Sequence, residues 1–202
     1  MTPLLSMHIT PFHADPHLQG LVSAVFDQKI VKTFVETGTY RGATLRWVAS
    51  HFPDVRCYSC EVDRACYVWS SFLTRKQKNI SIALSSSPPF LADLAFAPPK
   101  ALWWLDAHGE DGWPLLDEIE TIKDKGYRGI IIVDDFKVGI DGFQYLTLKG
   151  QECDEAYLRK AVGDNQIWVP DYPAPNRHVA GYAIIPWEVD LPSDLFQGFR
   201  KL

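Results

Sequence analysis

Runs of apolar residues alternate with segments of helical periodicity along most of the chain. Short apolar runs predict five strands, over 33–36, 55–60, 80–84, 101–105 and 129–133. The spacing of apolar residues predicts helices over 17–30, 43–51, 64–76 and 114–125. Because the runs 101–105 and 129–133 are apolar at nearly every position, we expect a parallel sheet covered by helices on both faces.

The last third of the chain changes in pattern. Residues 136–150 are irregular and rich in glycine, 153–162 have helical spacing, and two strand-like runs follow at 166–169 and 179–185. A turn-rich segment joins these two runs, so they predict a closing hairpin. The expected fold is therefore α/β, a doubly wound, Rossmann-like, seven-stranded and mostly parallel sheet with a C-terminal antiparallel hairpin. We expect one domain over 1–202, with a lead-in and helix (1–30), a core (31–136) and a variable loop, helix and hairpin (137–202).

Composition and charge exclude several classes of partner. The chain has 202 residues, a net charge of −5 and a pI near 5.6, so it lacks the excess of Lys and Arg that nucleic-acid binding requires. No apolar run approaches the ~20 residues that span a bilayer, and the first 15 residues do not resemble a signal peptide. We expect a soluble, cytoplasmic protein with neither nucleic acid nor membrane as partner. Cys57 and Cys60 form a Cys-x-x-Cys, but within a strand they face opposite sides, which favours reduced structural thiols.

The segment from Glu36 to Gly42 carries the first chemical signal. A strand ends in Glu36, and Gly38 and Gly42 follow, four residues apart, before a helix begins. Glycine lets a ligand approach the backbone closely, and the first turn of the helix offers free N–H groups beside it. The spacing differs from the dinucleotide Gly-x-Gly-x-x-Gly, because Tyr40 and Ala43 occupy the positions of its second and third glycines. The segment is either a nucleotide-type cofactor loop or a plain strand-to-helix turn.

Other strands end in polar residues at the same expected edge of the sheet. Glu61 closes the second strand, 25 residues after Glu36, where an acidic residue can bind ribose hydroxyls. A solvated loop carboxylate is the alternative for Glu61. The third strand ends in Ser85, Ser86 and Ser87, which form either a turn or a set of small donors beside a base ring.

Three carboxylates follow the fourth and fifth strands. Asp106 ends one of these strands, and Asp134 and Asp135 end the other. Neighbouring strands lie ~4.8 Å apart, so these carboxylates can converge on one divalent cation, such as Mg²⁺. Asp134 and Asp135 can share an ion only if the backbone turns between them, and otherwise one of them caps the next segment. His108, two residues after Asp106, is either a general base or a solvated loop histidine.

In combination, the Glu36-x-Gly38-x-x-x-Gly42 turn, Glu61, Asp106 and the pair Asp134-Asp135 resemble class I S-adenosylmethionine-dependent methyltransferases. Within this class the chain is most similar to the metal-dependent O-methyltransferases of the macrocin type, and more distantly to the catechol type. The resemblance covers residues 31–136 and, by topology, the final hairpin. It implies that 31–136 is a cofactor-binding and metal core.

The resemblance also implies roles for single residues. It places the methionine end of S-adenosylmethionine beside Glu36, Gly38, Thr39 and Gly42, its ribose at Glu61 and its adenine near Ser86 or Ser87. Asp106 would lie beside the cofactor and, with Asp134 and Asp135, would hold Mg²⁺, and His108 would be the base. Two positions depart from the pattern: serine replaces the acidic residue expected after the third strand, and Gly109 stands where catechol-type enzymes carry a lysine.

Two other functions stay open at this point. The segment Asp106-Ala107-His108 also resembles the metal-binding Asp-Ala-His of arginase-type ureohydrolases, but the other motifs of that two-metal site are missing. A cofactor-binding or glycan-associated module without turnover is the other alternative. For an enzyme, we expect a small hydroxylated acceptor of sugar, polyketide or phenolic type. The sequence does not set the oligomeric state, and a homodimer is one option.

Overall fold

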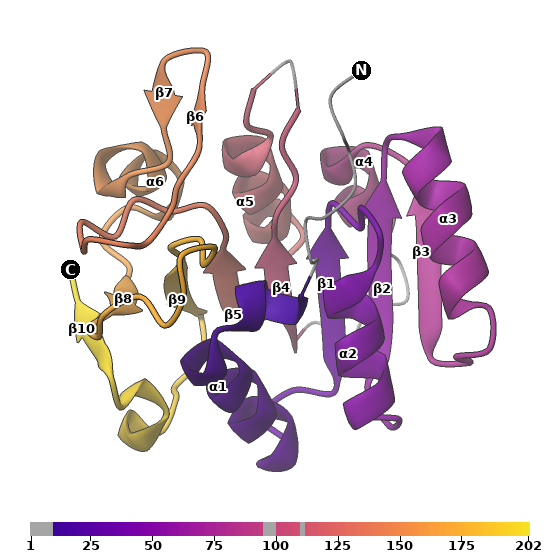
Figure 1. Cartoon of the computed structure of the whole chain (residues 1–202), viewed down its shortest axis with the longest axis horizontal. Helices are drawn as coiled ribbons and strands as arrows, with labels where there is room; N and C mark the ends of the chain where they lie inside the picture. Colours follow the sequence, from indigo (N-terminus) through magenta and orange to yellow (C-terminus); the bar gives the residue numbers. More distant parts are fainter. Residues whose placement is uncertain (1–9, 95–99, 110–111) are drawn as a thin grey trace.

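An eight-stranded sheet forms the centre of the molecule (Figure 1), in a computed structural model that describes residues 10–94, 100–109 and 112–202. The strand order is β10-β8-β9-β5-β4-β1-β2-β3. The five parallel strands are β1 (Thr33–Thr37), β2 (Arg56–Glu61), β3 (Ile80–Leu84), β4 (Lys100–Leu105) and β5 (Arg128–Val133). β9 (Ala183–Trp187) runs antiparallel to β5, and β8 (Trp168–Pro170) and β10 (Phe199–Lys201) extend the sheet with antiparallel pairing.

The predicted mostly parallel sheet and closing hairpin are confirmed, and the strand count is corrected. The hairpin of β8 and β9 lies beside β5, as expected from the two strand-like runs. The sheet has eight strands rather than seven because β10, three residues near the C-terminus, adds to the edge at β8. A second, two-stranded sheet, β6 (Thr147–Leu148) with β7 (Gln151–Glu152), begins within the region 136–150 that was expected to be irregular and ends just after it.

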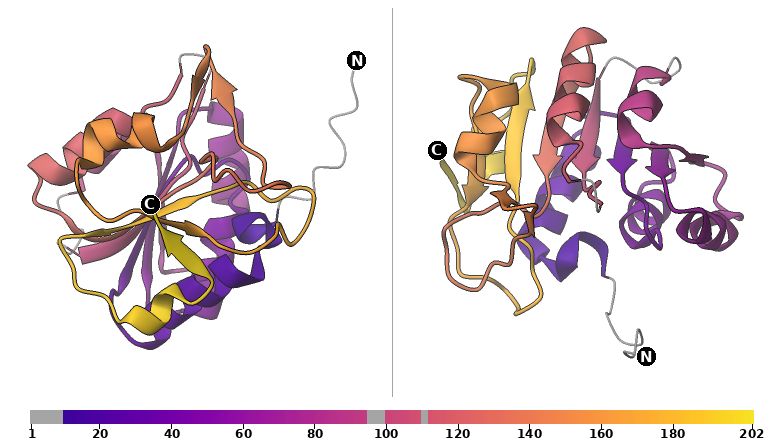
Figure 2. Two further views of the ribbon diagram at one scale, coloured as in Figure 1. Left: turned by 90° about the vertical axis from the view of Figure 1, so that its left-hand side faces the viewer. Right: turned by 90° about the horizontal axis from the view of Figure 1, so that it is seen from above.

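Helices cover both faces of the sheet (Figure 2). On one face lie α1 (Pro16–Asp27), α2 (Ala43–His51) and α3 (Arg64–Thr74), and on the other α4 (Ser87–Ala92), α5 (Leu115–Asp124) and α6 (Glu155–Val162). Successive strand residues point to opposite faces, so one core contains Phe34 and Leu102 while the other contains Val35 and Trp103. This alternation confirms the doubly wound arrangement.

The two cysteines of the Cys-x-x-Cys lie on opposite faces of β2, as the sequence predicts. Cys57 belongs to the core under α1 and α2, and Cys60 to the core under α4 and α5. Both thiols are free and buried, and burial raises the pKa of each well above its usual range. They are therefore reduced packing residues in this structure.

Helix α4 was not expected from the sequence. The serine run at 85–87 was expected to be either a turn or a set of small donors, whereas in the structure the two prolines that follow it occupy the first turn of α4. Proline suits that position because the first N–H groups of a helix have no partner within it. The serines thus lie at the start of a helix, beside the carboxyl end of β3.

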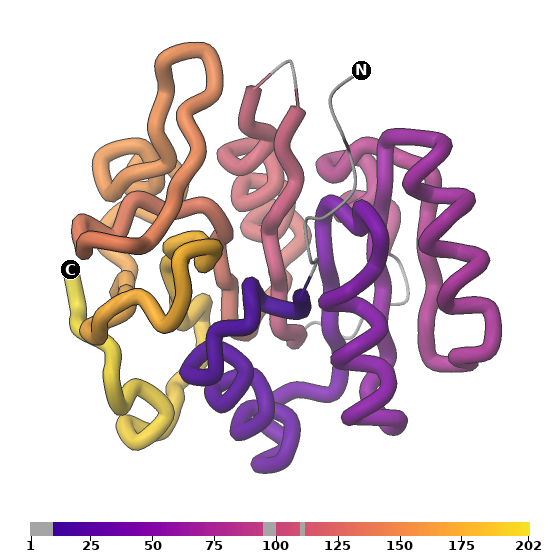
Figure 3. The backbone as a smooth tube through the Cα atoms, in the orientation of Figure 1, coloured from indigo at the N-terminus to yellow at the C-terminus, as the bar shows by residue number. Residues whose placement is uncertain are grey.

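The segment before α1, expected only as a lead-in, folds into a short 3₁₀ helix, η1 (Pro11–Ala14). Phe12 and His13 have left-handed backbone angles, with φ of 50° and 55°. Phe12 is almost fully buried, and its ring makes edge contacts with Phe34, Trp47 and Trp104. As Figure 3 shows, the start of the described chain therefore lies against the middle of the sheet. Residues 1–9 of the predicted lead-in lie outside the described residues.

Within the described ranges, none of the helices is both long and apolar enough to cross a membrane.

Candidate active site

A cleft of about 1300 Å³ opens beyond the carboxyl ends of the parallel strands. This is the edge at which open α/β sheets bind ligands. Its walls come from η1, the glycine turn, the loops after β2 to β5, and the segment around residues 144–146 and 177–180. The predicted site residues that line it are Glu36, Gly38, Thr39, Glu61, Ser86, Ser87, Asp106, His108, Asp134 and Asp135.

The glycine turn has the backbone that the sequence predicts. Gly38 has φ of +80°, and a Cβ atom there would lie 2.7 Å from the carbonyl oxygen of Asp106. Gly42 has φ of +70° and precedes α2 without a side-chain cap, and the Leu45 N–H in the first turn of α2 lies against the Glu36 carboxylate. Both positions require glycine for backbone reasons. Gly42 itself does not line the cleft but shapes its wall.

Glu36 lies at the floor of the cleft in a chain of short hydrogen bonds. The Ser59 hydroxyl donates to its Oε2 at 2.6 Å, and the Thr39 and Ser59 hydroxyls lie 2.6 Å apart. Glu36 is 2% exposed, and this burial raises the pKa of its carboxyl to about 8 despite the bond from Ser59. A cationic group of a ligand would stabilise the charged form.

Glu61 organises the loop on the ribose side of the predicted cofactor site. Its Oε2 accepts a hydrogen bond from the Tyr40 N–H at 2.6 Å, and its Oε1 accepts one from the Asp63 N–H at 2.8 Å. Tyr40 has φ of 47°, so this bond helps to hold a left-handed residue in the glycine turn. Each carboxylate oxygen has a second lone pair, which leaves Glu61 able to accept from a ligand hydroxyl.

The serine run forms the next part of the wall. Ser86 is exposed, whereas Ser87 is buried at the start of α4. Beneath Ser87, the fully buried Glu118 of α5 forms no hydrogen bond of good geometry through either carboxylate oxygen, although the hydroxyls of Ser87 and Thr37 lie close enough to favour its charged form. Burial raises the pKa of Glu118 to about 7. This polar pocket under the cleft has no counterpart in the sequence-based predictions.

Asp106, Asp134 and Asp135 lie close together, as their positions after β4 and β5 predict. The Asp106 N–H donates to Thr37 and the Asp134 N–H donates to Leu105, so both residues extend the strand pairing. Asp135 has φ of 54°, so the backbone turns directly after Asp134. The turn separates the two aspartates: Asp134 faces His13, and Asp135 faces His108.

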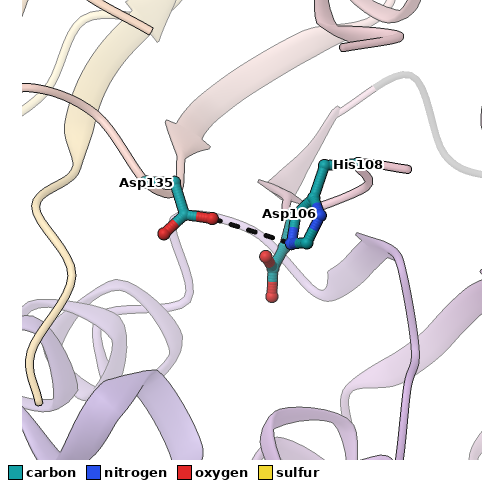
Figure 4. Close-up of side chains that lie close together, drawn as sticks. All are labelled: Asp106, His108 and Asp135. Carbon is teal, nitrogen blue, oxygen red and sulfur yellow. Dashed lines mark ion pairs between the residues drawn. The ribbon is translucent and has the colours of Figure 1, made fainter. Parts of the chain in front are cut away.

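The side chains of Asp106, His108 and Asp135 could hold one cation together. One ligand atom each from Asp106, His108 and Asp135 lies within 4.8 Å of the others. Figure 4 shows the three side chains pointing toward one another, with His108 Nε2 3.7 Å from Asp135 Oδ2. Two carboxylates and an imidazole suit a divalent transition metal such as Mn²⁺, and the two carboxylates alone also suit Mg²⁺.

His13 was not predicted as a site residue. Its Nε2 lies 3.0 Å and 2.7 Å from the two carboxylate oxygens of Asp134. Burial alone would lower the pKa of His13, but the charge of Asp134 and this hydrogen bond outweigh it and raise the pKa to about 9. His13 is therefore an imidazolium near neutral pH, paired with Asp134.

Burial and the nearby charges also shift the pKa values of the three aspartates. Burial, followed by the charges of Asp134 and Asp135, raises the pKa of Asp106 well above its usual value. Burial and the charge of Asp134 raise the pKa of Asp135 to about 7, although the His13 charge opposes this. Burial opposes ionisation of Asp134, yet His13 lowers its pKa. The pKa of His108 is lowered by burial, which leaves its imidazole neutral and able to accept a proton.

The far end of the cleft is lined by Trp113, Arg177 and His178. Trp113 meets the His108 ring edge-on, with ring centroids 5.9 Å apart. Arg177 and His178 are exposed at the rim, and Arg177 Nε donates to His178 Nε2 at 3.0 Å. These residues come from loops, where periodicity gives no signal of their position in space.

Comparison with known proteins gives the fold a family context. Neither a protein-family model nor a curated protein matches the sequence. Among solved structures, SAH-bound PaMTH1, a methyltransferase of Podospora anserina, is 20% identical with a TM-score of 0.62, over 88% of this chain and 81% of that one. The O-methyltransferase TomG from Streptomyces achromogenes, in complex with SAM, is 14% identical with a TM-score of 0.60, over 84% and 79%. A Klebsiella pneumoniae protein proposed to be an O-methyltransferase is 17% identical with a TM-score of 0.62, over 89% and 84%.

The chain thus shares the fold of these methyltransferase structures, as the sequence predicts.

Proposed function

We propose that the protein is an S-adenosylmethionine-dependent O-methyltransferase acting on a small hydroxylated acceptor. The observation that carries this proposal is the cleft itself, which joins the glycine turn and Glu61 at one end to the Asp106, His108 and Asp135 cluster at the other. The fold supports this function over a ureohydrolase, since the structural neighbours are described as methyltransferases.

The cofactor would lie across the ends of β1 and β2. Glu36 would face its ammonium group, Glu61 would accept from its ribose hydroxyls, and Ser86 and Ser87 would lie near its adenine. The N–H groups at the start of α2 and the close approach allowed by Gly38 support this placement. The methyl group would then point toward His108.

In the proposed reaction the acceptor's hydroxyl oxygen bonds to the methyl carbon as the carbon–sulfur bond breaks. The electron pair of that bond stays on sulfur, which gives S-adenosylhomocysteine. The hydroxyl proton passes to Nε2 of neutral His108, and Asp135, 3.7 Å away, stabilises the resulting imidazolium. Trp113 and His108 would orient the acceptor, and binding of both reactants in one cleft would supply proximity.

A divalent cation, such as Mg²⁺, fits the same end of the cleft. Asp106 and Asp135 would hold it, with Asp134 joining only if His13 releases that carboxylate. The cation would lower the pKa of the acceptor's hydroxyl. The spacing of 4.8 Å or less also favours His108 as a third ligand, which is the alternative to its role as base.

Substitution of His108 separates its two roles. If His108 is the base, His108→Ala lowers turnover by about 10²–10⁴-fold and leaves the binding of Mn²⁺, measured by calorimetry, unchanged. If His108 is a ligand, the affinity for Mn²⁺ falls as well. Asp135→Asn should weaken Mn²⁺ binding in both cases.

The overall proposal is tested with methyl-labelled S-adenosylmethionine and a panel of sugar, polyketide and phenolic acceptors. Transfer of label to a hydroxyl oxygen supports the proposal. Binding of S-adenosylhomocysteine without transfer to any acceptor would instead favour a cofactor-binding module without turnover. Small acceptors remain the expected partners, in the cytoplasm and without nucleic acid or membrane.

A further inference from the structure

Helix α3 presents its apolar side chains to solvent. Val68, Trp69 and Phe72 are 58%, 54% and 55% exposed, whereas the fully buried positions of the helix are the polar Ser70 and Thr74. Ser70 and Thr74 pack against Gly42 at the start of α2. A surface helix normally has the opposite arrangement, with apolar residues facing the core.

The apolar surface continues onto the adjoining strand ends. Val62, directly after β2, is 71% exposed, and Leu84, at the end of β3, is 48% exposed. β3 is an edge strand of the sheet, and α3 lies at the same end of the molecule (Figure 1). Several exposed apolar side chains at one end of a molecule mark a candidate interaction site. We call Val62, Val68, Trp69, Phe72 and Leu84 the α3 patch.

We propose that the α3 patch binds the α3 patch of a second copy of this chain, with the two helices antiparallel. The sizes of the facing side chains are compatible with a second copy of the chain as the partner. A two-fold axis beside Val68 and Trp69 would place Phe72 of each copy against Ala65 of the other, a large side chain against a small one. Val68 of each copy would face Trp69 of the other.

The charges at the two ends of α3 support the same orientation. One end carries Asp63 and Arg64, whose charges offset each other, and the other end carries the basic Arg75 and Lys76. An antiparallel pair sets Arg75 and Lys76 of each copy against Asp63 of the other and opposes the two helix dipoles. A parallel pair would set the Arg75 and Lys76 residues of the two copies together.

The size of the α3 patch limits the expected affinity between the two copies. α3 has 11 residues and is about 16 Å long, so this contact is smaller than the ~800 Å² per partner of a standard interface. We therefore expect a reversible dimer with a dissociation constant of about 1–100 μM. Because Val62 and Asp63 also line the cleft, the second copy would lie beside the predicted cofactor opening.

Sedimentation velocity at about 2–500 μM tests the proposal. The wild type should shift from monomer to dimer, and Trp69→Lys should raise the dissociation constant at least tenfold. Tyr145→Lys is the matched control, since Tyr145 is another exposed aromatic residue far along the chain, and it should dimerise like the wild type. A wild type that stays monomeric throughout, or that binds anionic vesicles through Trp69 as a monomer, would overturn the proposal.

Cysteine cross-linking tests the antiparallel orientation. In a Cys66→Ser background, Val68→Cys lies near the axis and should form an intermolecular disulfide on mild oxidation. Ala65→Cys should not cross-link to itself, because an antiparallel pair separates the two positions by about 10 Å along the helices. Efficient self-cross-linking of both variants would indicate a parallel pair and contradict the proposed orientation.

Discussion

Nε2 of His13 lies within 3.0 Å of both carboxylate oxygens of Asp134, although 121 residues separate the two in the chain. This pair ties the 3₁₀ helix η1 to the carboxyl end of β5 and places a cation among three clustered aspartates. It neutralises one carboxylate of the cluster and leaves Asp106 and Asp135 facing His108.

The His13 to Asp134 pair should stabilise the protein in a pH-dependent way. The pKa of His13 is raised from 6.5 to about 9, so its contribution is complete below pH 6.5 and is lost as the pH rises through about 9. His13→Ala should lower the free energy of unfolding by about 2–4 kcal/mol at pH 6, and much less at pH 10. Chemical denaturation at both pH values measures this. His178→Ala, at an exposed histidine of the same cleft, is the control, and an equal loss at the two pH values would rule out the charged pair.

The His13→Ala substitution should also change the affinity for a divalent cation. Removal of His13 frees both oxygens of Asp134 beside Asp106 and Asp135. His13→Ala should therefore bind Mn²⁺ more tightly than the wild type in calorimetric titrations at pH 7.5. An unchanged or weaker affinity would mean that Asp134 does not compete between His13 and a cation.

Glu118 should destabilise the folded chain as the pH rises. Burial raises the pKa of Glu118 from 4.5 to about 7. Below pH 4.5 the carboxyl is protonated in both the folded and the unfolded chain, and as the pH rises from 4.5 through 7 the free energy of unfolding falls, because ionisation is easier in the unfolded chain. Glu118→Gln should match the wild type near pH 4.5 and exceed its free energy of unfolding by up to about 3 kcal/mol at pH 8. Glu120→Gln, on the exposed side of the same helix, should show no such trend. A destabilised Glu118→Gln at pH 8 would indicate that the ionised carboxylate has an essential partner.

Cofactor binding should release protons through Glu36. Burial raises the pKa of Glu36 to about 8, so the carboxyl is largely protonated at pH 7 in the free protein. The ammonium group of the bound cofactor would favour the carboxylate, with release of up to about one proton at pH 7. Titrations with S-adenosylhomocysteine in buffers of different ionisation enthalpy measure this number. Binding that is independent of the buffer would place the ammonium group away from Glu36.

Glu61 should contribute to cofactor affinity through its charge. Loss of a charge-assisted hydrogen bond costs ~1.5–3 kcal/mol, so Glu61→Ala should bind S-adenosylhomocysteine about 10- to 150-fold more weakly. Asp63→Ser is the control, because a serine can still cap α3 while the neighbouring charge is removed. If Glu61→Ala retains wild-type affinity, the ribose lies elsewhere.

The sequence predicted elements where local signals agree. Gly42 and Pro53 frame the helix at Ala43–His51, and the apolar runs locate β1 to β5 to within about one residue. The signal was misleading for α4, since serine and proline favour both a turn and a helix start. It was too weak for β10, a three-residue edge strand whose pairing depends on β8.

Within the site, the residues that end strands were predictable because parallel strands bring their carboxyl ends to one edge. Asp106, Asp134 and Asp135 converge for that reason. His13 and Arg177 were not predicted, because each reaches the cleft through tertiary packing of a loop or short turn rather than through a periodic pattern. Glu118 has an apolar-face position on α5, where sequence alone does not distinguish a buried carboxylate from an exposed one.

Calorimetric titration of the wild-type protein with S-adenosylhomocysteine, with and without Mg²⁺, tests the proposed cofactor site most directly. Binding of one molecule per chain with a dissociation constant of about 100 μM or tighter, and a higher melting temperature of the complex, is the expected result. No heat of binding and no change in melting temperature at millimolar S-adenosylhomocysteine would contradict the proposed methyltransferase function.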